Sequence, residues 1–319
     1  MTQTNWKKLG KVFDPTKLDS GIWMREYAQY PTPFILNDNV LRVYFATRPS
    51  KDSDLMYASY PAYVDLNRHN LLEVINIAKQ PLLPLGGTGS FDEFGIIPGS
   101  ILRASNLVYM YYAGWTLMSS VPHIVNIGLA ISRDGGTKFE KVAEGPVLGL
   151  TFKEPYFANS PTVKIIDFVW HMWYQTGLKW LPNDGQPESV YQIAHATSLD
   201  GIKWERNGKL IVPAMHKFEC QDIFMPVHRD GRWHAVFGYH MPLGLGADQV
   251  SISLGHAWSS DMLTWQRDDA KIGFFPGGSD WDSEMQFSSQ LFELDGRFLL
   301  IYCGNQFGRE GFGIAEWLS

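Results

Sequence analysis

The sequence contains one short pattern five times, at nearly even spacing. In each copy a proline or serine opens a hydrophobic stretch, and a polar turn joins this stretch to a second one that is rich in aromatic residues. The copies are anchored at Pro31, Pro98, Pro161, Pro226 and Ser288, at intervals of 62 to 67 residues. Such a period indicates a fold made of similar units that bury their hydrophobic faces against one another.

A second pattern follows the first in the three middle units. It has an apolar stretch, a turn with the sequence Ser-x-Asp and an aromatic residue, at residues 130–139, 196–204 and 257–265. Turns of this kind between alternating apolar and polar residues predict a β-hairpin. Each unit then has four strands, the number found in a propeller blade. The sequence therefore predicts an all-β protein, a five-bladed β-propeller with four-stranded antiparallel blades.

The two ends of the chain give a further indication. Residues 6–15 repeat the offsets of residues 204–213, where we expect an outer strand, yet no earlier strands precede them. Residues 311–317 resemble a third strand that lacks a fourth. We therefore expect the N-terminal strand to complete the last blade, cover its exposed edge and make residues 1–319 a single domain. The alternative is a β-sandwich or a two-domain β-protein in which prolines recur by chance.

Composition limits the kind of ligand. The net charge of −6 and the absence of a basic run disfavour a nucleic-acid partner. Two cysteines make no disulfide framework, and no stretch approaches the ~20 apolar residues of a membrane span. We therefore expect a cytoplasmic protein with no membrane contact. Its 14% of aromatic residues suit a small-molecule or oligosaccharide sugar ligand. The sequence leaves the oligomeric state open.

Carboxylates precede the first strand of every predicted blade. They are Glu26 in the first blade, Asp92 and Glu93 in the second, Glu154 in the third, Glu219 and Asp222 in the fourth, and Asp282 and Glu284 in the fifth. Because first strands line the axis of a propeller, we expect these acids to converge on one mouth of the channel. Glycoside hydrolysis uses one protonated and one ionised carboxyl group, and crowding would raise the pKa of one of them. The alternative is structural: Asp92 and Asp282 occupy equivalent positions and would cap the loop that enters the strand.

Several motifs resemble a known superfamily. The stretches GSFDEFGIIPGSIL, AISRDGG, HATSLDGIKW, DWDSEM and IYCGNQFGREGFGIA are similar to those of the five-bladed propellers of glycoside hydrolase families 32, 43 and 130. The resemblance covers nearly the whole chain and is strongest to a branch often encoded with bacterial surface-polysaccharide genes. It implies an enzyme that hydrolyses or transfers a glycosyl unit, in the manner of a glycosidase, transglycosidase or phosphorylase.

The resemblance also suggests catalytic residues. Residues 218–222 are similar to the Glu-Cys segment that holds the general acid in family 32, so Glu219 is the expected acid. Its ionised partner is expected among Glu26, Asp92 and Glu284. The sequence departs from that family in two ways, because the Glu-Cys segment lies later in the chain and Tyr30 and Pro31 replace the first-blade aspartate region. The family's Arg-Asp-Pro motif is also absent, which leaves transfer, phosphorolysis or simple binding as possibilities.

Six further residues are candidates for substrate binding. They are Arg48, Tyr27, Trp115, Glu154, Asp222 and Trp281. An arginine suits an anionic sugar or a phosphate group, and a tryptophan can stack on a sugar ring. A surface position for Arg48 and core packing for both tryptophans agree equally well with the sequence. We expect no cofactor and no metal, because nine scattered histidines make a chance cluster such as His216, Glu219 and Asp222 easy.

Two functions remain open at this point. The first is a carbohydrate-active enzyme with paired carboxylates, in which Glu219→Gln abolishes turnover but leaves sugar binding. The second is a non-catalytic carbohydrate-binding or scaffolding propeller in polysaccharide biosynthesis, in which amide substitutions weaken binding only. The fold cannot decide between them, because propellers host many unrelated functions.

Overall fold

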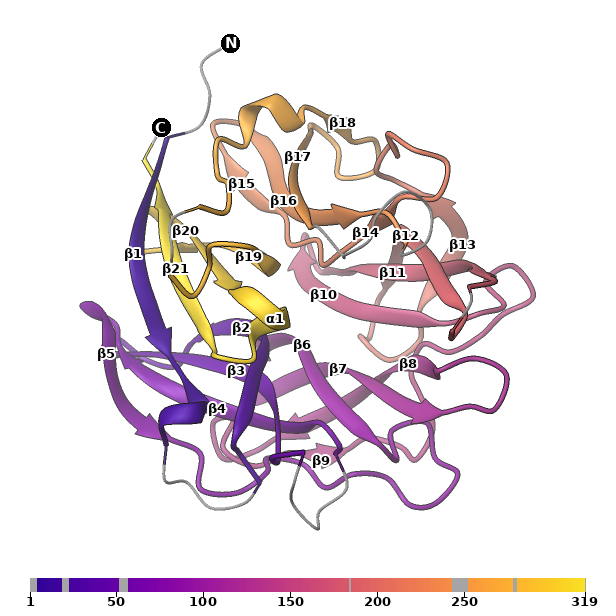
Figure 1. Cartoon of the computed structure of the whole chain (residues 1–319), viewed down its shortest axis with the longest axis horizontal. Helices are drawn as coiled ribbons and strands as arrows, with labels where there is room; N and C mark the ends of the chain where they lie inside the picture. Colours follow the sequence, from indigo (N-terminus) through magenta and orange to yellow (C-terminus); the bar gives the residue numbers. More distant parts are fainter. Residues whose placement is uncertain are drawn as a thin grey trace.

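The computed structural model describes residues 5–18, 23–51, 57–183, 185–242, 252–277 and 280–318. Its strands form five antiparallel sheets that surround a common axis as the blades of a propeller (Figure 1). The first strand of each sheet lies innermost, next to the axis. The predicted all-β, five-bladed β-propeller is therefore confirmed.

The first four blades each use one continuous part of the chain. Blade one contains β2 (Glu26–Ile35), β3 (Val40–Arg48), β4 (Tyr60–Asn67) and β5 (Asn70–Ile77). Blade two contains β6 (Gly95–Ala104), β7 (Leu107–Leu117), β8 (His123–Ser132) and β9 (Glu140–Lys141). Blade three contains β10 (Ala158–Ile166), β11 (Val169–Leu181), β12 (Glu188–Ser198) and β13 (Glu205–Leu210). Blade four contains β14 (Cys220–Gln221), β15 (Val227–Arg229), β16 (Arg232–His240), β17 (Ser253–Ser259) and β18 (Gln266–Arg267).

Blade five combines both ends of the chain. It contains β19 (Phe287–Leu294), β20 (Arg297–Cys303), β21 (Phe312–Trp317) and β1 (Trp6–Phe13). Strand β1 runs antiparallel to β21, with Trp6 opposite Trp317 and Phe13 opposite Phe312. Figure 1 shows the indigo β1 beside the yellow β21, at the outer edge of the ring. The predicted closure by the N-terminal strand is confirmed.

The described residues also contain three short helical turns. They are η1 (Pro15–Lys17), η2 (Asp269–Lys271) and α1 (Asn305–Gly308). None of the helices in the described part of the chain is long and apolar enough to cross a bilayer.

Three of the innermost strands bend at a residue with a left-handed backbone. Tyr30, Ser160 and Ser288 have φ of 55°, 48° and 52°, and each lies at a shift of the strand register. Ser288 is thus the counterpart of Tyr30. The sequence repeat aligned Ser288 with Pro31, but the structural counterpart of Pro31 is Ser289, one residue later. A positive φ is costly for residues other than glycine and is often found near functional sites.

The innermost strand of blade four is interrupted. Strands β14 and β15 both pair with β16, and the Asp222 N–H continues the first ladder with a bond to the Gly238 carbonyl at 2.7 Å. Pro226 has no backbone N–H to donate, which favours a break in the strand here. The break begins directly after Asp222.

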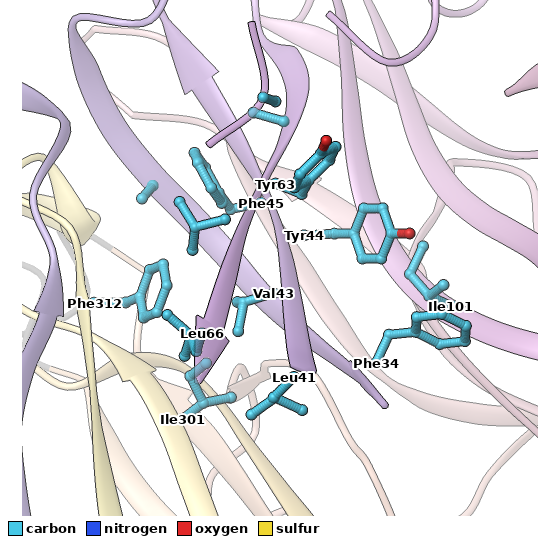
Figure 2. Close-up of a cluster of buried hydrophobic side chains, with 14 of the residues drawn as sticks. Phe34, Leu41, Val43, Tyr44, Phe45, Tyr63, Leu66, Ile101, Ile301 and Phe312 are labelled. Carbon is cyan, nitrogen blue, oxygen red and sulfur yellow. The ribbon is translucent and has the colours of Figure 1, made fainter. Parts of the chain in front are cut away.

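Apolar side chains fill the space between neighbouring blades. Figure 2 shows Phe34 of blade one beside Ile101 of blade two, and Phe312 of blade five on the opposite side of blade one. The rings of Phe45 and Phe312 lie 6.1 Å apart, and both side chains are fully buried. Each such side chain contributes about 1.5 to 3 kcal/mol on burial, so these contacts hold the inner strands in place around the axis.

Candidate functional site

Four blades share an ion pair between a buried carboxylate of the loop that enters the blade and a cation of the outermost strand. The pairs are Asp92 with Lys141 of β9 (2.7 Å), Glu154 with Arg206 of β13 (3.2 Å), Glu219 with Arg267 of β18 (2.5 Å) and Asp282 with Lys8 of β1 (2.6 Å). We call these pairs clasps. All four carboxylates are buried. Since three strand spacings of about 4.8 Å separate the outermost strand from the innermost one, a clasp draws its acid away from the axis.

Tyrosines of the second strand support three of the clasps. The hydroxyl groups of Tyr112, Tyr174 and Tyr302 donate to Asp92, Glu154 and Asp282 at 2.9, 2.7 and 2.9 Å. In each of these blades the acid lies five positions before the residue of the innermost strand that pairs with the residue after the tyrosine. These innermost-strand residues are Ile97, Asn159 and Phe287. The same sequence distance recurs in the three blades, so these three clasps are a repeated part of the scaffold.

Blades one and four vary this arrangement. Blade one has the buried Met24 in place of the acid and the buried Phe45 in place of the tyrosine. Blade four has Phe237 in place of the tyrosine. There Glu219 accepts hydrogen bonds from the Gln221 amide at 3.0 Å and from the Met215 N–H at 3.1 Å.

The structure does not bring the predicted catalytic acids together. Asp92 and Glu219 are held in clasps, as is Glu154, which we expected to bind substrate. Glu284 is exposed, and its backbone N–H donates to Asn305 at 2.8 Å. Catalytic roles for Asp92, Glu219 and Glu284 stay predictions that this geometry does not favour, because the clasps give two of them a structural role and the third faces solvent.

One residue of each blade occupies the same register position beside the axis. These residues, which we call the axial ring, are Gln29, Ile97, Asn159, Asp222 and Phe287. Each pairs with the residue of the second strand that comes directly after the clasp tyrosine, or after the phenylalanine that replaces it in blades one and four. Asp222 is the only carboxylic acid among the five. The acid that reaches the axis is therefore a residue that we predicted to bind substrate.

Asp222 is almost fully buried, with 2% of its surface exposed. One carboxylate oxygen accepts from the amide of Gln175 at 3.0 Å, and the other accepts from the N–H of Ser288 at 3.2 Å. Among the described residues no basic side chain lies within ion-pairing distance of Asp222. Its carboxyl group is thus positioned by neutral donors alone.

Burial raises the pKa of Asp222 to about 6, although hydrogen bonds from Ile223, Ser288 and Gln175 act in the opposite direction. The group is therefore partly protonated near neutral pH. A carboxyl group with a pKa near the working pH can both donate and accept a proton, as a general acid requires.

Gln175 is a site residue that sequence reasoning missed. Its amide also donates to the Gln221 carbonyl at 3.1 Å, and its own carbonyl accepts from the Ser160 hydroxyl at 3.1 Å. The aligned repeats contain a signal for it, because the other blades have small residues at this position. They are Ala46, Ala113, Gly238 and Cys303.

Tyr30, Tyr191 and His240 were also missed. Burial raises the pKa of both tyrosines, and the charge of Asp222 adds to the rise in each. The Tyr191 hydroxyl lies 3.0 Å from Nε2 of His240, whose Nδ1 lies 3.0 Å from the Met241 carbonyl. Because a carbonyl only accepts, Nδ1 carries the proton and Nε2 accepts from Tyr191. These residues form an aromatic and polar wall beside Asp222.

A second polar group lies at the start of β2, on the same side of the propeller. Glu26 pairs with Arg309 at 2.8 Å and accepts a hydrogen bond from the Tyr57 hydroxyl at 3.2 Å. The guanidinium of Arg48 lies 5.2 Å from the rings of both Tyr27 and Tyr57. The predicted residues Glu26, Tyr27 and Arg48 are therefore brought together, and the Arg48 charge also reaches Tyr30.

The two predicted tryptophans differ in their surroundings. Trp281 is buried and stacks on Tyr302 with ring centroids 5.2 Å apart, as expected for core packing. Trp115 is partly exposed, and its ring centroid lies 6.4 Å from that of His123. Its indole covers Gly95, where any added Cβ would fall 1.8 Å from the indole nitrogen. Trp115 is thus fixed in place while one side remains accessible.

Metal ligands do not gather in the described residues. No group of three or more His, Cys, Asp or Glu side chains is arranged to hold an ion there. Both cysteines, Cys220 and Cys303, are buried free thiols, and burial raises the pKa of Cys220 to about 12. Neither thiol is therefore a ready nucleophile.

The ring of five blades places this protein in the class of five-bladed β-propellers with the glycoside hydrolase fold. A glycoside hydrolase matches 99% of this protein over 92% of its own length, with a TM-score of 0.75 and 15% identity. The RGII complex of BT0996 matches with a TM-score of 0.71 and 15% identity, over 99% of this protein and 91% of its own length. The GH32 β-fructofuranosidase BmSUC1 of Bombyx mori, in a variant bound to sucrose, matches with a TM-score of 0.62 and 12% identity, over 97% of this protein and 61% of its own length.

Curated relatives define the family more narrowly. This protein belongs to one family with the uncharacterized proteins MT1551 and Rv1502 of Mycobacterium tuberculosis, to which it is 30% identical over 97% of its length and 98% of theirs. The raffinose invertase of Escherichia coli is 35% identical over 79 residues, which cover 25% of this protein and 15% of the invertase. No family model matches the sequence.

Proposed function

We propose that this protein is a carbohydrate-active enzyme that cleaves or transfers a glycosyl unit, with Asp222 as the proton donor. The observation that carries the proposal is the buried axial carboxyl of Asp222, whose pKa is raised to about 6. A bound sugar that reaches the axial ring would place its glycosidic oxygen beside this group. Protonation of that oxygen makes the leaving group neutral, which is the acid's task in glycoside cleavage.

Glu26 is our proposed ionised partner. Its carboxylate pairs with Arg309, and the Tyr57 hydroxyl orients it. Tyr27 and Trp115 offer aromatic faces for the sugar, and Arg48 suits an anionic substituent. The sucrose and RGII complexes of the structural neighbours support a carbohydrate ligand.

We further propose a role in polysaccharide biosynthesis in the cytoplasm, where buried free thiols such as Cys220 stay reduced.

The test is turnover of a panel of nitrophenyl glycosides and bacterial oligosaccharides, measured with and without inorganic phosphate. Asp222→Asn should lower turnover about 10² to 10⁴-fold, the usual contribution of a general acid. Glu284→Gln is the matched control, because Glu284 is exposed and donates only its backbone N–H to Asn305. Equal activity of both variants and the wild type would rule out Asp222 as the acid.

A second function is favoured by the composition of the axial ring. Blade one contributes Gln29 rather than a carboxylate, so the ring itself holds one acid. This arrangement also suits a carbohydrate-binding propeller in which Asp222 accepts hydrogen bonds from hydroxyl groups. In that case Asp222→Asn weakens sugar binding, measured by calorimetry, and no glycoside in the panel is consumed.

A further inference from the structure

A cavity lies beyond the axial ring, toward the C-terminal ends of the innermost strands. It has a volume of about 610 Å³ and is lined by the ends of the innermost strands of all five blades. The lining begins three positions after the axial ring, at Thr32 after Gln29, Ser100 after Ile97 and Thr162 after Asn159. At about 3.3 Å per residue, the cavity begins roughly 10 Å from the axial ring along the strands. We call it the far cavity.

One position of the far cavity breaks the pattern of the repeats. At the register position that closes this end, four blades contribute apolar side chains, whereas blade three contributes Lys164. The apolar residues are Phe34, Leu102, Val227 and Phe292. Figure 2 shows Phe34 among the buried apolar side chains, next to Ile101. An ammonium group is therefore placed where packing alone would call for a hydrophobic residue.

The charge of Lys164 lacks a close partner in the described residues. Desolvation lowers the pKa of Lys164, and the charge of Glu293 acts against this shift without an ion pair. Arg103 also lines the cavity, with its guanidinium 5.4 Å from the ring of Phe34. Two cations thus face one carboxylate, in a protein whose net charge is −6. Lys164 is half-buried, and a partly desolvated cation without a close partner favours a bound anion.

Thr162 is an independent sign of a polar ligand. This residue lies on β10, two positions before Lys164. It lines the far cavity and is fully buried. Its hydroxyl group has no hydrogen-bond partner among the residues that the structure describes. Buried hydroxyl groups are nearly always paired, so Thr162 is expected to bind water or a ligand atom inside the cavity.

We propose that the far cavity binds a compact anion carrying a phosphate or carboxylate group, held by Lys164 and Arg103. The volume lies within the range of small-molecule sites and exceeds what a simple ion needs. Glu293 stands on the wall opposite Lys164 and can accept hydrogen bonds from hydroxyl groups of the same ligand. A small sugar phosphate and a sugar acid both have this chemistry. The inference is independent of the reaction proposed for Asp222.

The test is isothermal titration with glucose 6-phosphate, glucuronate and glucose as separate probes. We expect at least one anion to bind and glucose, which is neutral, to bind at least tenfold more weakly. Lys164→Met should weaken anion binding about tenfold or more, because a charge-assisted hydrogen bond is lost. The apolar residues of the other blades at this position indicate that methionine fits, and Lys164→Gln gives a second, polar variant.

Two controls separate the outcomes. Lys7→Met removes an exposed lysine from the outer strand β1 and should leave the affinity unchanged. Asp222→Asn should also leave it unchanged, since Asp222 does not line the far cavity. Absence of anion binding up to about 10 mM, or equal weakening by Lys7→Met and Lys164→Met, would overturn the proposal. Binding that is lost in Asp222→Asn but kept in Lys164→Met would place the anion at the axial ring and also overturn it.

Discussion

Glu219 and Asp222 are three residues apart, one on each side of strand β14, and have opposite surroundings. Glu219 is fully buried against Arg267 and lies in a clasp. Asp222 is equally hidden from solvent but has only neutral hydrogen-bond donors around it. The first carboxylate stabilises the blade because its charge is compensated. The second is held in a place that disfavours its charge, which is the property a proton donor needs.

The largest difference is expected when each carboxylate is replaced by its amide. Glu219→Gln should lower the free energy of unfolding by about 3 kcal/mol, the low end for a broken buried ion pair, because Arg267 loses Glu219 but keeps Asp269 at 2.7 Å. Urea denaturation at pH 7 measures this. Asp222→Asn should not destabilise the protein under the same conditions, since no ion pair is broken. A loss of similar size in both variants would contradict the assignment of different roles.

The pH dependence of stability should distinguish the same two residues. The pKa of Asp222 is about 6 when folded and near 3.8 when exposed, so folding favours its protonated form. Its contribution is therefore greatest below about pH 4 and is lost as the pH rises to about 6, a change of about 3 kcal/mol.

Denaturation curves recorded between pH 4 and 7 check this sign. The wild type should lose stability relative to Asp222→Asn across that interval, and the difference should become constant above pH 7. A difference that stays constant between pH 4 and 7 would show that the carboxyl group of Asp222 ionises normally.

The tyrosines of the clasps should have a smaller effect. Tyr174→Phe and Tyr302→Phe each remove one hydrogen bond to a buried carboxylate and should cost about 1 to 3 kcal/mol. Tyr109→Phe is the comparison, because Tyr109 is a partly exposed tyrosine of a second strand, β7, that makes no hydrogen bond to a clasp among the described residues. Thermal unfolding of the three variants measures the difference. Equal effects at all three positions would mean that the clasp tyrosines contribute no special stability.

The smallest effect concerns Gln175. Its amide lowers the pKa of Asp222, so Gln175→Leu should raise that pKa further by less than about one unit. The alkaline limb of the pH–activity profile, or NMR titration of Asp222, should move to higher pH. Gln29→Leu serves as the control, because Gln29 lies on the opposite side of the axial ring and donates to the Phe307 carbonyl at 3.0 Å. A shift of equal size in the control would remove the specific role of Gln175.

The repeats made the fold predictable, because blade spacing and strand alternation are properties of neighbouring residues. The ring closure by residues 6–13 also followed from one repeated stretch. The clasps were harder to predict, since each joins an acid to a cation on another strand. Even so, three of them leave a regular trace in the sequence: the cation follows 48 to 52 residues after Asp92, Glu154 and Glu219.

The site itself was only partly predictable. Asp222 and Glu219 share residue type and neighbourhood, and sequence alone gives no reason to separate an acid with a distant partner from one without. The similarity to the Glu-Cys segment of family 32 favoured Glu219, whereas the strand register places Asp222 beside the axis. Burial and the position of Arg267, both long-range properties, determine which acid has the raised pKa.

The closure of blade five also has a consequence for how the protein is made. Strand β1 leaves the ribosome before the other described strands, yet the Asp282 that binds Lys8 follows 274 residues later, and its partner β21 later still. At 5 to 20 residues per second, the first strand waits roughly 15 to 60 s for its place in the sheet. During translation strand β1 is therefore unpaired until β21 has been synthesised. Chaperone binding to β1 in that interval would protect its free backbone edge.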